Sequence, residues 1–284
     1  MKIEYRKFQK ADLSKIKEFT EVMPTYFEDW NSYAPVVLSD TNCVFYGAFQ
    51  GEKIIGLGNL RRKNKNIAWI ELIRVRPDNQ LKGIGTELFR FGDEIAKKLK
   101  YKIVGFATEG GNIGSCKIGE KLGFKLLTEM IPFWVESSKP KILKIENPRE
   151  PIPIDEALNL MYKIPDGPKD YIAIGWNFVP LEKSFFEKEP DMKFYAKNKT
   201  ILLEYLERDE VTDEVSWIKA IVYGAEEDAE YLISEYVERT KEYGEFLGCI
   251  TTTRLEHIPE KMKFIRSQSE GGRPNTIVMW EKKL

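Results

Sequence analysis

A short loop between a predicted strand and a predicted helix constrains this chain more than any other segment. The loop spans residues 75–86, and it carries glycine at positions 83 and 85, where the helix begins. The first turn of a helix has N–H groups without intrahelical partners and a partial positive charge. Because two of its residues have no side chain, these N–H groups can come close to an anion. The loop is therefore predicted to bind a diphosphate.

This loop does not fit the fingerprint of a dinucleotide-binding fold. The G-x-G-x-x-G pattern would need a third glycine at position 88, where the chain has Leu88. A simple strand-to-helix turn is the other interpretation of the two glycines.

The apolar pattern of the first half predicts alternating strands and helices. Strands are expected at residues 3–7, 42–49, 53–60, 68–75 and 102–108, and helices at 12–19, 86–100 and 112–122. Asp12 is a candidate N-cap of the first helix and Gly123 a candidate C-cap of the last. Residues 59–66 are expected to form a polar turn, and residues 124–135 a hairpin of two strands.

A proline-rich segment divides the chain. Four prolines lie within residues 137–153, which show little apolar periodicity. The expected division is a first domain at 1–140, a linker at 141–153 and a second domain at 154–284. The second half resembles a degenerate copy of the first, since residues 217–221 match residues 69–73 and a predicted helix and strand follow both. Only a tight turn fits after residue 221, so the copy has no room for the glycine loop.

Composition and charge exclude several classes of protein. Apolar residues make up 42% of the chain and aromatic residues 12%, as in folded globular proteins. Lys and Arg total 44 and Asp and Glu total 45, so no basic footprint for nucleic acid or an anionic membrane is expected. The first residues form a predicted strand rather than a signal peptide. Three scattered cysteines indicate a cytoplasmic location.

The single histidine limits the available catalytic chemistry. Any Ser-His-Asp or Cys-His site would have to use His257, and no nucleophile-elbow pattern accompanies it. One imidazole and three distant cysteines also predict no metal site.

Two motifs in the first half carry a specific resemblance. Gln80, Gly83 and Gly85 match the Q/R-x-x-G-x-G/A loop of the GNAT acyltransferase superfamily. Asn112 and residues 120–124 resemble its second motif, N-x-x-A-x-x-L-Y-x-x-x-G-F. The resemblance covers about residues 1–135. It implies an α/β fold with a mixed, mostly antiparallel central sheet flanked by helices, followed here by a smaller α/β domain that could share that fold.

The resemblance also implies a co-substrate and a site. The co-substrate is acetyl-CoA, whose pantetheine arm would pair with the strand before the loop and whose pyrophosphate would meet the loop. The acetyl acceptor would be a primary amine of a small molecule or a peptide. The residues expected to bind the co-substrate are Ile73, Arg74, Val75, Gln80, Leu81, Lys82, Gly83, Ile84, Gly85, Thr86, Asn112 and Ser115.

A carboxylate is expected to take the proton of the acceptor amine. At a pKa near 10.4, deprotonating an ammonium at pH 7 costs roughly 4–5 kcal/mol, and a positioned base eases such a step. Glu71 is the first candidate, because strand alternation would place it on one face with Ile73 and Val75. Glu109, at the end of the next strand, is the second. The alternative for Glu71 is an ion-paired or solvent-facing strand residue.

One position departs from the superfamily pattern. Gly119 stands where the second motif has a tyrosine that would protonate the leaving thiolate. A thiol with a pKa near 8.5 can leave without that acid, so a lower rate is expected rather than none. The alternative is a CoA-binding protein with weak catalysis that regulates or binds a partner.

The acceptor site is predicted from an aromatic and acidic segment. Tyr26, Glu28 and Trp30 would suit a cationic amine through charge and cation–π contacts, or would simply cover the sheet. The second domain is expected to cap the acceptor cleft or to form a homodimer interface.

Overall fold

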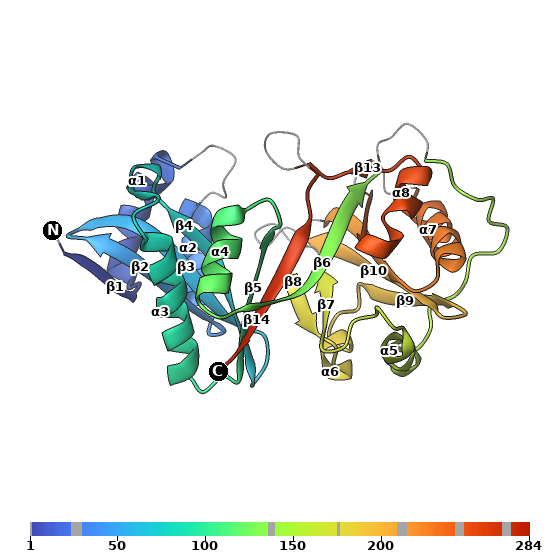
Figure 1. The fold of residues 1–284 in the computed structure, drawn as a ribbon, viewed down its shortest axis with the longest axis horizontal. Coiled ribbons are helices and arrows are strands. Elements are labelled where there is room, and N and C mark those ends of the chain that lie inside the picture. Colours follow the sequence, from blue (N-terminus) through green and yellow to red (C-terminus); the bar gives the residue numbers. More distant parts are fainter. Residues whose placement is uncertain are drawn as a thin grey trace. The chain divides into compact units, whose positions relative to one another are not determined.

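A computed structural model describes residues 2–23, 30–135, 140–174, 177–208, 215–241, 247–268 and 274–284 (Figure 1). The chain forms two compact units. The first comprises residues 1–107, 113–127 and 279–284, and the second comprises residues 108–112 and 128–278.

The first unit contains most of the elements predicted for the first half. Its strands are β1 (Ile3–Lys7), β2 (Cys43–Gln50), β3 (Lys53–Arg62), β4 (Ile67–Val75), β5 (Ile103–Glu109, its last two residues in the second unit) and the end of β14 (Ile277–Lys283). Its helices are η1 (Lys10–Lys15), α1 (Ile16–Glu21), α2 (Trp30–Ser39), η2 (Pro77–Asn79), α3 (Ile84–Lys98) and α4 (Ile113–Lys121).

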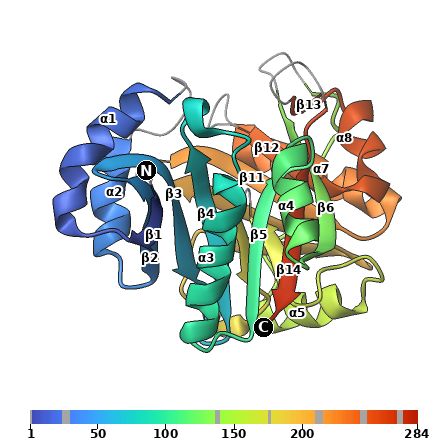
Figure 2. The same ribbon diagram turned by 60° about the vertical axis from the view of Figure 1, so that its left-hand side comes forward.

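A mixed sheet runs through this unit in the order β1-β2-β3-β4-β5-β14. The first four strands are antiparallel neighbours, and β4 and β5 are parallel. Helix α3 packs on one face of the sheet, whereas α1 and α2 pack on the other (Figure 2). The predicted α/β class and mostly antiparallel sheet are therefore confirmed.

The C-terminal strand completes the first unit. The Trp280 side chain is buried, and its ring stacks parallel to Phe106 of β5 with centroids 6.1 Å apart. Lys282 donates a hydrogen bond to the buried Asp93 of α3 at 2.9 Å, and Leu284 N–H donates to Lys102 C=O. The last residues of the chain are thus part of the core that the first hundred residues build.

The second unit has its own set of elements. They are the end of β6 (Lys125–Trp134), α5 (Ile154–Lys163), β7 (Tyr171–Ile174), β8 (Asn177–Pro180), α6 (Lys183–Phe186), β9 (Met192–Lys197), β10 (Thr200–Arg208), β11 (Val215–Tyr223), α7 (Glu226–Thr240), β12 (Leu247–Thr252), η4 (Thr253–Leu255), α8 (His257–Lys261) and β13 (Ile265–Arg266).

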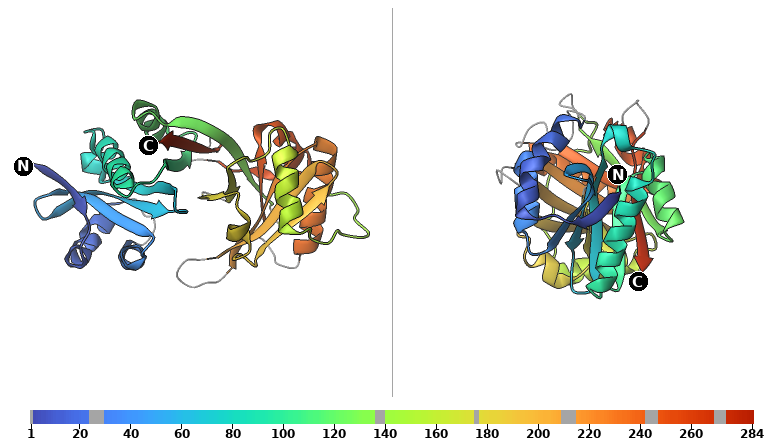
Figure 3. Two further views of the ribbon diagram at one scale, coloured as in Figure 1. Left: turned by 90° about the horizontal axis from the view of Figure 1, so that it is seen from below. Right: turned by 90° about the vertical axis from the view of Figure 1, so that its left-hand side faces the viewer.

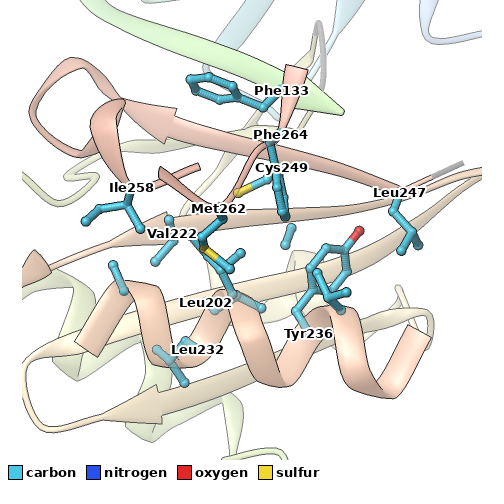
Figure 4. Packing of buried hydrophobic residues seen from close by; sticks show 14 of the residues in the cluster. Phe133, Leu202, Val222, Leu232, Tyr236, Leu247, Cys249, Ile258, Met262 and Phe264 are labelled. Carbon is cyan, nitrogen blue, oxygen red and sulfur yellow. The ribbon is translucent and has the colours of Figure 1, made fainter. Parts of the chain in front are cut away.

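The second unit repeats the element order of the first. Antiparallel β9, β10 and β11 are followed by α7 and a parallel β12, as β2, β3 and β4 are followed by α3 and β5. Helix α7 buries Leu232, Ile233 and Tyr236 in a core with β10, β11 and β12 (Figure 4). Helices α5 and α6 lie on the other face, where Phe186 meets Phe194 (Figure 3). The repeat predicted from residues 217–221 therefore extends from β9 to β12, whereas β7 and β8 form a separate two-stranded sheet.

Strand β6 corrects one prediction. Residues 124–135 form a single strand, not a hairpin, because Met130–Trp134 pairs with β12 on one side and Phe133–Trp134 pairs with β13 on the other. Strand β6 begins in the first unit and ends in the second, and β14 begins in the second and ends in the first. Each half of the chain therefore gives one strand segment to the other half's unit.

Two local predictions also need correction, and a third is confirmed. Residues 10–15 form a 3-10 helix whose N-cap is Gln9, and Asp12 is buried inside it, where it accepts hydrogen bonds from Arg6 at 2.7 and 2.8 Å. Strand β3 continues to Arg62, so the turn predicted at 59–66 is shorter. Gly123 does take the left-handed conformation of a helix C-cap, with φ at 80°.

The expected division into 1–140, 141–153 and 154–284 stays a prediction about domains. The compact units have other borders, because strand segments are exchanged between the halves. In the described ranges, no helix is both long and apolar enough to cross a membrane.

The exchanged C-terminal strand yields a stability prediction. Replacing Trp280 by alanine removes a buried ring from the core of the first unit and should lower its free energy of unfolding by about 3–5 kcal/mol. Urea denaturation followed by circular dichroism would measure this loss. Lys283→Ala, an exposed change on the same strand, is the control and should cost less than about 0.5 kcal/mol. Equal effects of the two changes would contradict a structural role for β14.

Candidate functional site

An opening between two parallel strands is the main feature of the first unit. The ladder between β4 and β5 joins Ile67–Trp69 to Ile103–Gly105. No ladder pair follows between these two strands, although both are described along their whole length and β4 continues to Val75. The edge of β4 from residue 70 onward is therefore open to an added extended chain, which would pair with it as a further strand.

A β-bulge lies in β4 at this opening. Asn59 of β3 pairs with Glu71, whereas Leu57 pairs with Arg74, so β4 has an extra residue. Leu72 is in the left-handed region with φ at 59°, which is rare for a leucine. The bulge changes which face of the sheet the following side chains meet.

The predicted diphosphate loop follows β4 directly. Buried Arg76 anchors its start, donating through N–H to Ile55 C=O and through Nε to Asp78 Oδ1 at 3.3 Å. Gln80 donates to Val75 C=O at 3.3 Å, and Lys82 Nζ donates to Asp78 C=O at 2.6 Å. These contacts fold the loop back on itself and leave Leu81 fully exposed.

The backbone conformation favours glycine at one of the two loop positions, and packing does not require it at the other. Gly83 is the N-cap of α3 with φ at 83°, a conformation that disfavours any side chain. A Cβ built there would meet no atom within 4 Å, so the space above it is open. A Cβ at Gly85 would make ordinary contacts with Ile118 at 3.6 Å and Val75 at 3.8 Å. Protein packing therefore does not require glycine at position 85.

The N-terminus of α3 has the properties that an anion-binding site needs. The first hydrogen bond of the helix runs from Glu87 N–H to Gly83 C=O, so the N–H groups of residues 84–86 precede the helical ladder. The helix is fifteen residues long, and the N-terminal end of its dipole favours a negative charge. The backbone donors and the open space at Gly83 thus fit the diphosphate that the sequence predicts.

Glu71 lies in a polar network rather than in solvent. Its Oε1 accepts hydrogen bonds from Arg61 Nε at 2.7 Å and from Asn59 Nδ2 at 2.9 Å, and its Oε2 is 3.9 Å from Lys63 Nζ. The side chain is 20% exposed. Arg61 also donates to Asp40 Oδ2 at 3.0 Å. The ion-paired alternative for Glu71 is thus what the structure contains.

The expected common face of Glu71, Ile73 and Val75 is wrong. A Cβ at Gly58 would meet Ile73 Cδ1, whereas Glu71 contacts Asn59, the next residue of β3. Gly58 and Asn59 are adjacent on β3, so their side chains point to opposite faces of the sheet. The side chains that they meet, Ile73 and Glu71, therefore also lie on opposite faces. The bulge at Leu72 breaks the alternation, and Glu71 faces the α1 and α2 side of the sheet.

Three charged or polar neighbours of Glu71 were missed from the sequence: Asn59, Arg61 and Asp40. Although burial acts to lower the pKa of Arg61, the Glu71 charge and hydrogen bond raise it well above its ordinary value. The polar residues at alternate positions 59 and 61 of an apolar strand were the available signal. Cys43 adjoins this group, and burial raises its pKa to about 11, so it remains a thiol near neutral pH.

Gly119 of α4 faces the core of the first unit. A Cβ there would lie 2.7 Å from Phe106 Cζ and 3.5 Å from the Trp280 ring. These two rings fill the space that a larger side chain would need. The absence of a tyrosine at this position therefore has a packing reason in this chain.

Of the other predicted site residues, some lie in β5 and α4, and some fall outside the described residues. Glu109 ends β5 and is assigned to the second unit, where it accepts a hydrogen bond from Asn275 at 3.4 Å. Asn112 is exposed just before α4, and Ser115 is half-buried in its first turn. Tyr26 and Glu28 lie outside the described residues, as does the side chain of Trp30, whose backbone begins α2.

The second unit lacks the corresponding opening and loop. Its parallel ladder continues from Ile218 to Val222 against Leu247–Thr251. Gly224 links β11 to α7 with φ at 129°, and Thr200 Oγ1 accepts a hydrogen bond from Ala225 N–H at 2.8 Å. The first turn of α7 is acidic at residues 226–228, which repels an anion. The copy is therefore closed to a diphosphate.

No group of three or more metal-ligating side chains gathers in the part of the chain that the structure describes.

Comparisons with known proteins bear on the fold. Residues 5–124 match the model of the acetyltransferase (GNAT) family. No protein of curated function matches the chain. A candidate acetyltransferase from Thermoplasma acidophilum aligns with 100% of this chain and 100% of its own at 11% identity and a TM-score of 0.60. One from Pyrococcus horikoshii aligns over 99% and 89% at 13% identity and a TM-score of 0.58.

A third solved structure extends the likeness. It is a GCN5-related N-acetyltransferase from Kribbella flavida, aligned over 100% of this chain and 71% of its own at 10% identity and a TM-score of 0.55. At these identities the likeness shows a shared fold, and it covers both halves of the chain.

Two helix glycines give a paired stability prediction. Gly119→Ala should lower the free energy of unfolding by about 1–3 kcal/mol, because its Cβ forces the Phe106 ring to move. Gly85→Ala meets only ordinary contacts and should leave stability unchanged or raise it by up to about 1 kcal/mol through helix propensity. Thermal and urea denaturation of both variants would measure the difference. A stable Gly119→Ala protein would show that this packing is loose.

Proposed function

We propose that this chain transfers an acetyl group from acetyl-CoA to an amine, on the premise that residues 5–124, which match the model of the GNAT acetyltransferase family, share the activity of that family. The observation that carries the proposal is the open edge of β4, which leads directly into the loop at the mouth of α3. Strand edge and helix mouth together suit an extended arm that ends in a diphosphate.

The co-substrate would be held mainly by backbone groups. Residues 73 and 75 would pair with the pantetheine arm, and the N–H groups of residues 81–86 would bind the pyrophosphate. Open space above Gly83 and the ordinary surroundings of Gly85 support close approach of an anion. Lys82 would add a charge, although its ammonium also binds Asp78 C=O. The bound thioester would supply the activated acetyl group.

Glu71 is the proposed acceptor of the ammonium proton. Its carboxylate faces the side of the sheet on which α1 and α2 pack, the side from which an acceptor amine is expected. Asn59 and Arg61 both bind Oε1, which fixes the carboxylate and directs Oε2 away from them. We propose that Oε2 takes the proton, directly or through one water. Glu109 remains the second candidate.

Departure of the thiol needs no side-chain acid in this proposal. Gly119 offers none, and the rings of Phe106 and Trp280 occupy its surroundings. A thiolate with a pKa near 8.5 is stable enough to leave and to take a proton from water.

The absence of that acid also supports a second candidate function. A protein that binds CoA tightly but transfers acetyl groups slowly would act as a regulatory or interaction protein in its CoA-bound form. Amine-dependent release of free thiol distinguishes the two functions when it is followed with polyamines, aminoglycosides, amino acids and peptide N-termini as acceptors.

Binding of CoA should depend on the loop. Gly83→Glu places a carboxylate in the open space at the mouth of α3 and should weaken CoA binding at least about 100-fold by charge repulsion and occlusion. Isothermal titration calorimetry with CoA would measure this.

Gly51→Glu is the matched control, because Gly51 also has positive φ, at 62°, but lies in the exposed β2–β3 turn. It should lose similar stability and keep its affinity for CoA. If both variants bind CoA as the unchanged protein does, the proposed site is wrong.

Acetyl transfer should depend on Glu71. Glu71→Gln keeps the shape of the side chain but removes its basicity, so amine-dependent thiol release should fall about 10²–10⁴-fold while CoA affinity stays within about threefold. Glu4→Gln, an exposed change on β1, should leave both quantities unchanged. An unchanged rate in Glu71→Gln, with a normal rate in the control, would eliminate Glu71 as the base and direct attention to Glu109.

A further inference from the structure

The second unit contains a pocket that acetyl transfer does not explain. Its volume is about 220 Å³. Most of its lining is apolar, and its lining residues come from β6, β11, β12 and the segments around β13 and β14: Pro132, Phe133, Trp134, Trp217, Lys219, Gly248, Ile250, Ser267 and Ile277.

The pocket lies on the sheet face away from α7. Ile218 and Ala220 of β11 are buried in the core with α7, so the alternating Trp217 and Lys219 point to the opposite face. Cys249 of β12 likewise joins that core, whereas Gly248 and Ile250 line the pocket. The pocket thus lies mainly on the face of the sheet opposite the packed core shown in Figure 4, and Phe133 belongs to both.

This face corresponds to the Glu71 face of the first unit. Glu71 follows Trp69 by two residues on the strand before the parallel partner, and Lys219 follows Trp217 in the same way. In both units these side chains point away from the long helix that joins the two parallel strands. The repeat therefore has a pocket on the face that corresponds to the proposed acceptor side, and there it has the ammonium of Lys219 in place of the carboxylate of Glu71.

The same repeat has lost the parts that would hold an acyl donor. The ladder of β11 and β12 continues without an opening as far as Val222, the turn at Gly224 is tight, and α7 begins with three acidic residues. A ligand in this pocket would therefore be bound without being acetylated there.

Lys219 is the charged group of the pocket. Its ammonium makes an ion pair with Glu207 and lies 5.6 Å from the centre of the Trp217 ring. Its aliphatic stem passes over Gly248, where a Cβ would come within 3.1 Å of Lys219 Cγ. An ammonium has three N–H donors, so it can bind a second carboxylate besides Glu207.

We propose that this pocket binds a small carboxylate with a flat apolar body. The indole of Trp217 and the walls from Pro132, Ile250 and Ile277 would receive the apolar part, and Lys219 would bind the carboxylate. A volume of 220 Å³ is below the roughly 300–1,000 Å³ of pockets for drug-sized ligands, so the ligand is small. The second half of the chain is then a ligand-binding module built on a closed acetyltransferase fold.

Three probes that share a benzyl group test the chemistry on the unchanged full chain: phenylacetate, its isostere phenylacetamide, and phenethylamine. Binding is followed by tryptophan fluorescence and by titration calorimetry at low ionic strength. Phenylacetate should bind at least about tenfold more tightly than phenylacetamide, and phenethylamine should bind most weakly. Equal affinities for all three, or no binding of any at millimolar concentration, would overturn the proposal.

Lys219→Met locates the binding. It should lower phenylacetate affinity about tenfold, with little change for phenylacetamide, because only the carboxylate loses a hydrogen bond from a charged donor. Lys193→Met, an exposed lysine change on β9, should leave both affinities unchanged. Retained selectivity for phenylacetate in Lys219→Met would place the carboxylate elsewhere and refute the assignment. The comparison of probes on the unchanged chain remains decisive if the variant does not fold.

Discussion

The early end of the β4–β5 ladder is the constraint on which the first unit depends. The two parallel strands pair only as far as Trp69 and Gly105, and in the described ranges no ladder joins them beyond that point. A strand edge that carries no ladder can accept another extended chain. The bulge at Leu72 accompanies this separation, and it also turns Glu71 to the face opposite Ile73. In the function proposed above, this one local irregularity would divide the region into a side for the extended arm and a side for the acceptor.

The exchange of strand segments makes the two halves depend on each other. Trp280 and Lys282 come from the end of the chain, yet they pack against Phe106 and Asp93 of the first unit. Residues 130–134 of the first half pair with β12 of the second unit, and residues 133–134 also pair with β13. The core of the first unit includes the C-terminal strand segment, so it is complete only when the whole chain has folded. The long intervening loop must first close, at a cost in chain entropy, before these contacts can form.

The two units differ at the start of the helix that joins the two parallel strands. In the second unit the ladder is longer, the turn is tighter and the helix begins with acids, and each of these differences disfavours a diphosphate. On the sheet face away from α7 the second unit has a pocket, and there the stem of Lys219 passes over Gly248. The architecture does not depend on the glycine loop, since the helix and the sheet are held by their shared apolar core.

The sequence by itself determined the parts that follow from local chemistry. Strand and helix periodicity located most elements, and the glycines at 83 and 85 marked a helix mouth suited to an anion, because positive φ and missing side chains are local properties. Tertiary structure alone decided the bulge at Leu72, since leucine carries no signal for the left-handed conformation. It also decided the Arg61–Glu71 pairing and the place of Trp280, because strand register and the exchange of segments depend on contacts between residues far apart in the chain.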